Sequence, residues 1–81
     1  MADTDALRDF IRRQFLFDES AQLGDDDPLF PDVIDSLGVM EVVDFVEEKY
    51  GVGIEEDDLL ADNFRSLTAI ASLVDRKRDG A

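Results

Sequence analysis

The sequence contains no cysteine and no histidine. These absences exclude disulfides, the zinc sites that thiolates and imidazoles build, and Ser-His or Cys-His triads. No apolar run approaches the roughly 18 residues of a membrane-spanning helix, and the start Met1-Ala2-Asp3 lacks the basic residues of a signal peptide. We therefore expect a reduced, cytoplasmic protein.

Basic residues are also scarce. Eight Lys and Arg stand against 21 Asp and Glu, which gives a formal net charge of -13. Between Gln14 and Phe64, Lys49 is the only basic residue. This charge repels nucleic acid and anionic lipid, so we expect neither a nucleic-acid nor a membrane partner. The acidic middle of the chain is either a docking surface for basic partners or only a highly soluble face, and charge alone leaves both open.

The chain is 81 residues long, and hydrophobic residues make up 44% of it. That length predicts a single domain over residues 1–81, with an ordered core over about residues 5–78. The apolar content is sufficient for one packed core but the length leaves no room for a second core or a deep enclosed active site.

Hydrophobic periodicity predicts a first helix over residues 4–17, which Thr4 or Asp5 can cap. Residues 18–35 contain Gly24, Pro28 and Pro31 and predict a long connection. Its apolar residues are expected to anchor it to the core: Leu23, Leu29, Phe30, Val33 and Ile34.

Residues 36–50 carry the strongest helical pattern, and Gly51 stands where a C-cap glycine belongs. A short helical turn is predicted over residues 57–61, burying Leu59 or Leu60. Ser66 is expected to cap a final helix that ends at about Arg78. No segment alternates as a strand would. The predicted fold is all-α: a small four-helix bundle of three long helices and one short helix, with a long loop between the first two.

Catalytic and metal sites are not indicated. A calcium-binding loop starting at Asp25 would need a polar ligand at Leu29 and a glycine at Phe30. The adjacent pairs of glutamates diverge on a helix and do not form a general acid and base. We therefore expect no catalytic residue and no metal ligand, and we expect that the protein is not an enzyme.

Ser36 stands at the start of the best-defined helix, between Asp35 and Leu37. Either Ser36 or Asp35 can be a plain N-cap, but a capping box from Ser36 would need Glu or Gln where the chain has Val39. A hydroxyl at this place can also carry a phosphate ester close to free N–H groups and the positive end of the helix dipole. A plain cap and a modification site both remain open from position alone.

The sequence from Asp35 to Val43 resembles the phosphopantetheine attachment motif of acyl carrier proteins. In that family Asp-Ser-Leu begins the second helix, which is acidic and ends in a Glu-Glu-x-aromatic-Gly pattern, here Glu47 to Gly51. The third-helix region and the final helix are also similar, and the resemblance covers residues 5–78. The residues that carry the third-helix part are Ile54, Asp57, Leu59, Asn63 and Phe64.

The resemblance implies a four-helix bundle whose serine, here Ser36, carries covalent 4′-phosphopantetheine as a thioester arm. The thiol would then come from the cofactor, as a chain without cysteine requires. Asp35 would be the motif neighbour of the attachment site. The face implied for partner recognition, with apolar residues among carboxylates, consists of Leu37, Met40, Glu41, Asp44, Glu47 and Glu48.

The function implied is that of an acyl carrier protein, a monomer that shuttles an acyl thioester in fatty acid, polyketide or related biosynthesis. Its partners would be a phosphopantetheinyl transferase and a ligase that forms acyl- or aminoacyl-adenylates, a ketosynthase or an acyltransferase, with basic docking patches. Asp44 and Phe45 depart from the residues of many fatty-acid carriers and suggest a stand-alone carrier of secondary metabolism, loaded by a dedicated adenylating ligase. Two alternatives are an aminoacyl or peptidyl carrier and an unmodified acidic interaction module.

Overall fold

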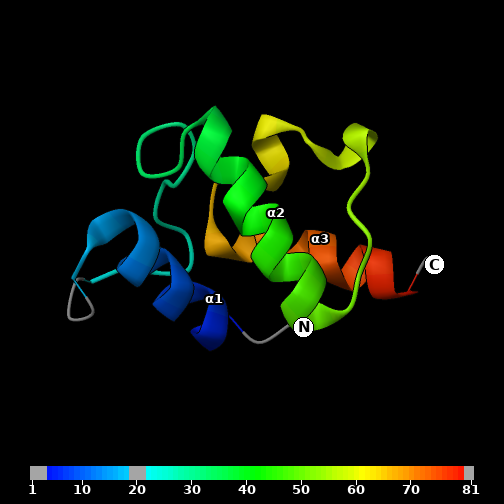
Figure 1. Cartoon of the computed structure of the whole chain (residues 1–81), viewed down its shortest axis with the longest axis horizontal. Coiled ribbons are helices and arrows are strands. Elements are labelled where there is room, and N and C mark those ends of the chain that lie inside the picture. Colours follow the sequence, from blue (N-terminus) through cyan, green and yellow to red (C-terminus); the bar gives the residue numbers. More distant parts are fainter. Residues whose placement is uncertain (1–3, 19–21, 80–81) are drawn as a thin grey trace.

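The computed structural model describes residues 4–18 and 22–79. Within these ranges the chain is helical and has no strand, so the predicted all-α class is confirmed. Three α-helices form the frame: α1 (Asp5–Ile11), α2 (Ser36–Tyr50) and α3 (Leu67–Asp79) (Figure 1). None of the helices in the described part of the chain is long and apolar enough to cross a membrane.

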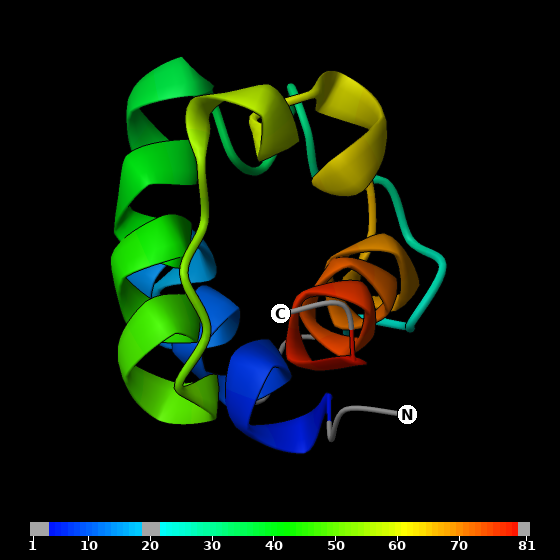
Figure 2. The same cartoon turned by 90° about the vertical axis from the view of Figure 1, so that its right-hand side faces the viewer.

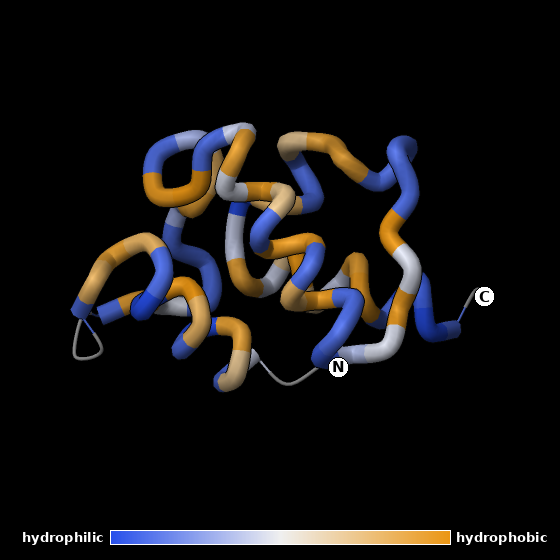
Figure 3. Tube along the Cα trace, in the orientation of Figure 1, coloured by the Kyte–Doolittle hydropathy of each residue, from blue (hydrophilic) through white to orange (hydrophobic). Residues whose placement is uncertain are grey.

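In the side view of Figure 2, α2 and α3 lie on opposite sides of the molecule. α1 lies near one end of the space between them, and the segment around residues 56–63 bridges the other end. Figure 3 shows hydrophobic and hydrophilic residues alternating along these helices, as expected when one face of each helix is buried. All three helices contribute to one core, in which the fully buried side chains include Leu7, Ile11, Val42, Val46, Leu67, Ile70 and Val74.

α1 continues directly into a five-residue π-helical turn, Arg12–Leu16, and together they cover most of the predicted first helix. The turn ends at Phe17, which has a left-handed backbone with φ 54°. The predicted N-cap of this helix is wrong, because no side chain accepts a hydrogen bond from its first turn. Thr4 holds the N-cap position but has helical rather than extended dihedrals, and its hydroxyl donates to Asp25 Oδ1 at 3.3 Å instead of accepting from the helix.

The connection between α1 and α2 is anchored as predicted, with Leu23, Leu29 and Ile34 buried. Arg8 of α1 donates from Nε to the Leu23 carbonyl at 2.8 Å and forms ion pairs with Asp5 and Asp25. On the other side, backbone hydrogen bonds join the connection to the start of α3: Leu29 N to Arg65 O at 2.7 Å and Thr68 N to Asp25 O at 3.0 Å.

α2 begins and ends where the sequence predicts. Asp35 is its N-cap, with an extended backbone, and its Oδ1 accepts from Gly38 N at 2.7 Å. The cap therefore belongs to Asp35, and Ser36 is the first residue of the helix. Gly51 ends the helix with φ 69°, the left-handed conformation that favours glycine. α3 has the predicted cap as well, because Ser66 Oγ accepts from Ala69 N at 3.1 Å.

The predicted short helix over residues 57–61 is not confirmed. Two three-residue 3₁₀ turns, Glu56–Asp58 and Ala61–Asn63, take its place, so the described chain has three α-helices rather than four. The Asp58 side chain accepts from Glu55 N at 2.9 Å and forms a capping box with the Glu55 side chain around the first turn. Leu59 and Leu60 are 38% and 58% exposed, and the buried residue of this region is Phe64.

The two 3₁₀ turns are fastened to α3 by polar side chains. Lys77 Nζ lies 2.8 Å from Asp58 Oδ2, and Arg76 donates to Asn63 Oδ1 at 3.0 Å. Asn63 in turn donates to the Asp58 carbonyl at 2.8 Å. The hydrogen bond from Lys77 lowers the pKa of Asp58, and the same bond raises the pKa of Lys77. The charged forms of both residues therefore stabilise the folded position of this segment.

Replacing Asp58 by Asn should lower the urea midpoint of unfolding at pH 7. A depressed carboxyl pKa stabilises the fold above the ordinary value of about 4, and this contribution is lost as the pH falls through the lower pKa of the folded state. The difference between wild type and Asp58→Asn should therefore shrink between pH 5 and about pH 2. Asp57→Asn, at the exposed neighbouring carboxylate, is the matched control and should change little. If the urea midpoints of wild type and Asp58→Asn differ by the same amount at pH 5 and at about pH 2, the ion pair does not stabilise the segment.

Candidate functional site

Ser36 is exposed at the first position of α2. Because Asp35 makes the capping bond, the Ser36 hydroxyl is not needed to satisfy the helix terminus. The start of α2 lies at the same end of the molecule as the 3₁₀ segment (Figure 1). A hydroxyl at this place is open to a second protein and lies at the positive end of the helix dipole, which favours a negatively charged substituent.

A pocket of about 210 Å³ opens beside Ser36, between α2 and the 3₁₀ segment. Ser36 contributes the hydroxyl, and the remainder of the lining is apolar: Phe30, Val39, Met40, Leu59, Leu60, Ala61 and Phe64. The sequence reasoning missed Leu59 and Leu60 as site residues because it assigned them to the core. The sequence does contain an indication of their exposure. The two leucines follow four consecutive carboxylates, and no apolar residues stand at helical spacing before them to form a buried face.

A second hollow of about 310 Å³ lies on the other side of the start of α2, against the π-helical turn. Its lining combines aromatic, aliphatic and acidic residues: Gln14, Phe15, Phe17, Asp32, Val33, Asp35, Leu37, Gly38 and Glu41. We call it the Phe17 groove. Ser36 thus stands between an apolar pocket and an acidic groove, and none of the described residues that line either hollow is a lysine or an arginine.

Gly38 permits the close approach of the π-helical turn to α2. A Cβ atom at this position would lie 2.7 Å from Cε1 of Phe15 and 3.2 Å from Cγ2 of Ile34. The Phe15 ring therefore packs directly against the first turn of α2. This contact places Ser36 at the edge of the Phe17 groove.

Most of the predicted recognition residues share an exposed face of α2. Leu37 is 81% exposed and Met40 is 50% exposed, and Glu41, Asp44 and Glu48 are exposed as well. The structure adds that Leu37 and Glu41 face the groove, whereas Met40 lines the pocket.

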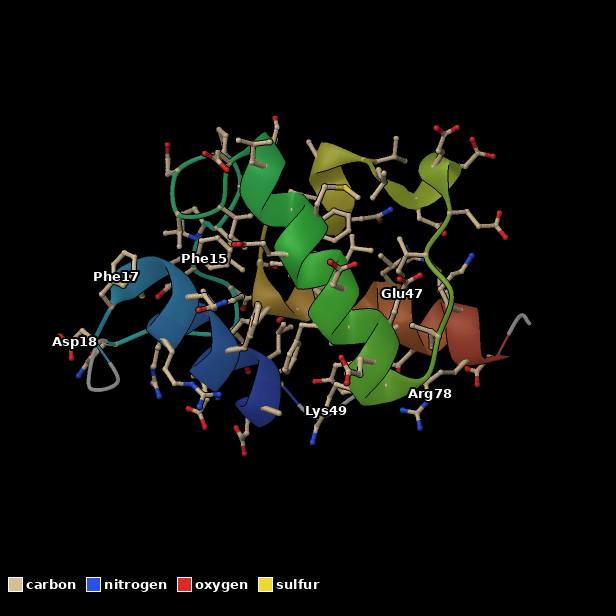
Figure 4. The ribbon with its side chains drawn as sticks, viewed as in Figure 1. Phe15, Phe17, Asp18, Glu47, Lys49 and Arg78 are labelled. Atoms are coloured by element: carbon tan, nitrogen blue, oxygen red, sulfur yellow. The ribbon has the colours of Figure 1, made fainter. Side chains whose placement is uncertain are left out.

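Glu47 is placed differently from the other predicted recognition residues. It is half-buried, and its Oε2 accepts from Ile54 N at 2.9 Å (Figure 4). Its carboxylate therefore fastens the segment after α2 to the helix. Lys49 lies at the end of α2 remote from Ser36, so its positive charge does not offset the carboxylates of the first two turns.

Comparison with known protein families gives a match that covers most of the chain. The family model described as phosphopantetheine attachment site matches residues 5–74. This range contains α1, α2, both 3₁₀ turns, both hollows and most of α3. No curated protein matches the chain.

Gly38→Ala should destabilise the protein, although alanine is favoured over glycine in a helix by about 1 kcal/mol. The reason is the overlap of the new methyl group with the Phe15 ring. In a Phe15→Leu background the smaller side chain removes this overlap, and Gly38→Ala should then stabilise. Urea unfolding of the four proteins gives the coupling energy, which should be about 1 kcal/mol or more. Additive effects would mean that Phe15 does not restrict residue 38.

Proposed function

The chain belongs to the family of carrier proteins with a phosphopantetheine attachment site, and we propose that Ser36 is the serine that carries its 4′-phosphopantetheine. Members of this family are not enzymes; they hold the group covalently on a serine and present it to enzymes. The exposure of Ser36 at the first position of α2 carries the proposal. Ser66 is buried with its hydroxyl used as a cap, Ser72 is half-buried within α3, and Ser20 lies outside the described residues.

The residues around Ser36 fit this group. The phosphodiester would be negatively charged, which suits the N-terminal end of α2. Met40, Leu59 and Leu60 offer apolar surface beside the hydroxyl for the uncharged parts of an arm and its cargo. When bound, the group supplies the thiol that a chain without cysteine lacks.

Ser36 would act as the nucleophile in its own modification. Its Oγ gives up a proton to a base of the transferase and forms a new bond to the phosphorus that bears the pantetheine in coenzyme A. The pyrophosphate bond of coenzyme A breaks and adenosine 3′,5′-bisphosphate leaves. Asp35 holds the first turn of α2 during this step through its bond to Gly38 N. The Ser36 hydroxyl stays available because it has no capping role.

The cargo that we propose is an acyl group, held as a thioester and shuttled between biosynthetic enzymes of a fatty acid, polyketide or related pathway. The support is the lining of the pocket beside Ser36, which is apolar apart from the serine. An aminoacyl cargo carries an ammonium group, and no carboxylate of the described residues lines that pocket to pair with it. Aminoacyl or peptidyl cargo is therefore the second candidate. Residues 1–81 would form one carrier domain that acts as a monomer.

The modification experiment tests Ser36 directly. A phosphopantetheinyl transferase and coenzyme A should add one phosphopantetheine to the wild type and none to Ser36→Ala, as read by intact mass. Ser72→Ala is the matched control and should be modified like the wild type. Modification of Ser36→Ala would refute the assignment, and a wild type that stays unmodified would favour an acidic interaction module. Loading of the modified protein by acyl- and aminoacyl-adenylate ligases then separates the two cargo classes.

The exposed carboxylates of α2 are proposed to steer basic partners toward Ser36. Glu41→Lys with Glu48→Lys should reduce the association rate with the transferase about tenfold at low salt, because fields of this kind accelerate encounter and are screened over about 8 to 10 Å. Asp26→Lys with Asp57→Lys changes the net charge equally on exposed residues outside α2 and is the control. Stopped-flow rates at several salt concentrations provide the measurement. Equal slowing by both pairs would show that total charge, not the face of α2, guides the encounter.

A further inference from the structure

Folding stability does not explain why a phenylalanine stands at position 17. Its side chain is 85% exposed, and its backbone is left-handed with φ 54° and ψ 30°. A bulky residue other than glycine is disfavoured in that conformation, and an exposed ring regains little by burial. Phe17 also ends a π-helical turn, a feature that is rare and frequent at functional sites.

The Phe17 groove presents an apolar surface within reach of Ser36. Phe17 and Leu37 are its two strongly exposed apolar residues, and Phe15 packs against Gly38 beneath them. Figure 4 shows Phe15 on the side of the π-helical turn that is nearer to α2, and Phe17 farther out, at the end of the turn. Two large side chains that expose apolar area next to one hollow are typical of a surface that a second protein covers.

The charges around the groove indicate what kind of surface would cover it. Asp32, Asp35 and Glu41 line it, and no described Lys or Arg does so. Asp35 is partly engaged by Gly38 N, whereas Asp32 and Glu41 are exposed. A complementary surface would therefore offer an apolar side chain for the space between Phe17 and Leu37, with Lys or Arg around it.

We propose that the Phe17 groove is a docking surface for the transferase that modifies Ser36, an enzyme with an apolar side chain framed by basic residues. The proposal rests on the function proposed for Ser36. This enzyme must bring its active site to the Ser36 Oγ itself, and Asp35 and Leu37, the chain neighbours of Ser36, both line the groove. A specific interface covers about 800 Å² on each partner, which extends well beyond a single residue. An enzyme that acts on the far end of a long arm has no such obligation to cover this surface.

The docking surface thereby extends from α2 onto the π-helical turn and Phe17. Leu37 and Glu41 belong both to the exposed face of α2 and to the groove, so the two surfaces are continuous. Phe17, at the end of the π-helical turn, is the residue that the turn adds to this docking surface. It contacts the partner and takes no part in the chemistry at Ser36.

The test compares the kinetics of modification of the wild type, Phe17→Ala and Phe17→Leu, using the transferase and coenzyme A. Phe17→Ala should raise KM for the carrier and lower kcat/KM about tenfold, as truncation of an interface aromatic does, with kcat unchanged. Phe17→Leu keeps part of the apolar contact and should therefore lose less kcat/KM than Phe17→Ala. Asp32→Lys should also raise KM, whereas Asp62→Lys, an equal charge change outside the groove, should not.

A second measurement separates docking from chemistry. Ser36→Ala has no hydroxyl to modify but keeps the groove, so it should inhibit modification of the wild type competitively. Ser36→Ala combined with Phe17→Ala should inhibit about tenfold more weakly. Helicity and urea midpoint of each variant should equal those of wild type, because Phe17 is exposed.

The possible outcomes are distinct. A wild-type kcat/KM for Phe17→Ala, or a loss confined to kcat, would overturn the docking surface while leaving Ser36 as the attachment site. An equal inhibition constant for the two Ser36→Ala competitors would overturn it as well. If the wild type itself is not modified, the proposed function fails and the docking proposal fails with it.

Discussion

The packing of the Phe15 ring against Gly38 is the contact on which the arrangement of the site depends. The ring lies 2.7 Å from the position that a Cβ atom at residue 38 would take, so the π-helical turn approaches the first turn of α2 more closely than a side chain there would allow. A row of aromatic contacts extends from it along the α1–α2 interface. Phe15 meets Phe10 edge-on at 6.3 Å, Phe10 stacks on Phe45 at 4.3 Å, and Phe45 meets Tyr50 edge-on at 6.5 Å. The bulk of Phe45 is thus used to join α1 to α2.

The negative charge of the chain is divided between two uses. Some carboxylates are bound within the fold: Asp25 to Arg8, Asp35 to the start of α2, Glu47 to Ile54 N and Asp58 to Lys77. Each of these offsets part of the repulsion by fastening a loop or a helix end. Glu41, Asp44 and Glu48 make no such bond among the described contacts and stay exposed on α2. In the proposed function, these exposed carboxylates would direct basic partners toward Ser36.

The sequence predicts features whose causes are local. The bounds of α2 follow from apolar periodicity and Gly51, the start of α3 follows from the Ser66 cap, and Ser36 lies within a continuous motif. Features that depend on contacts between distant residues were not predictable in this way. The 3₁₀ segment is held by Lys77 and Arg76, 19 and 13 residues from their partners Asp58 and Asn63. The Glu47 carboxylate accepts a hydrogen bond from the backbone N–H of Ile54, seven residues later, and is therefore not free on the predicted recognition face. The π-helical turn occurs where Phe15 packs on Gly38.

The apolar pocket and the Phe17 groove are bounded by segments that different interactions hold in place. Their proposed roles can therefore be affected separately. The apolar pocket is bounded by Leu59 and Leu60, whose positions depend on the polar bonds between the 3₁₀ segment and α3. The Phe17 groove is bounded by the π-helical turn and the start of α2, which are joined by aromatic packing and do not involve that segment. Loss of the Asp58–Lys77 pair therefore acts on the residues that bound the pocket and not on the packing that bounds the groove. If the groove serves the step at the bare Ser36 hydroxyl and the pocket serves the loaded arm, as proposed, breaking the Asp58–Lys77 pair would alter how the cargo is held and leave the packing beneath the docking surface intact.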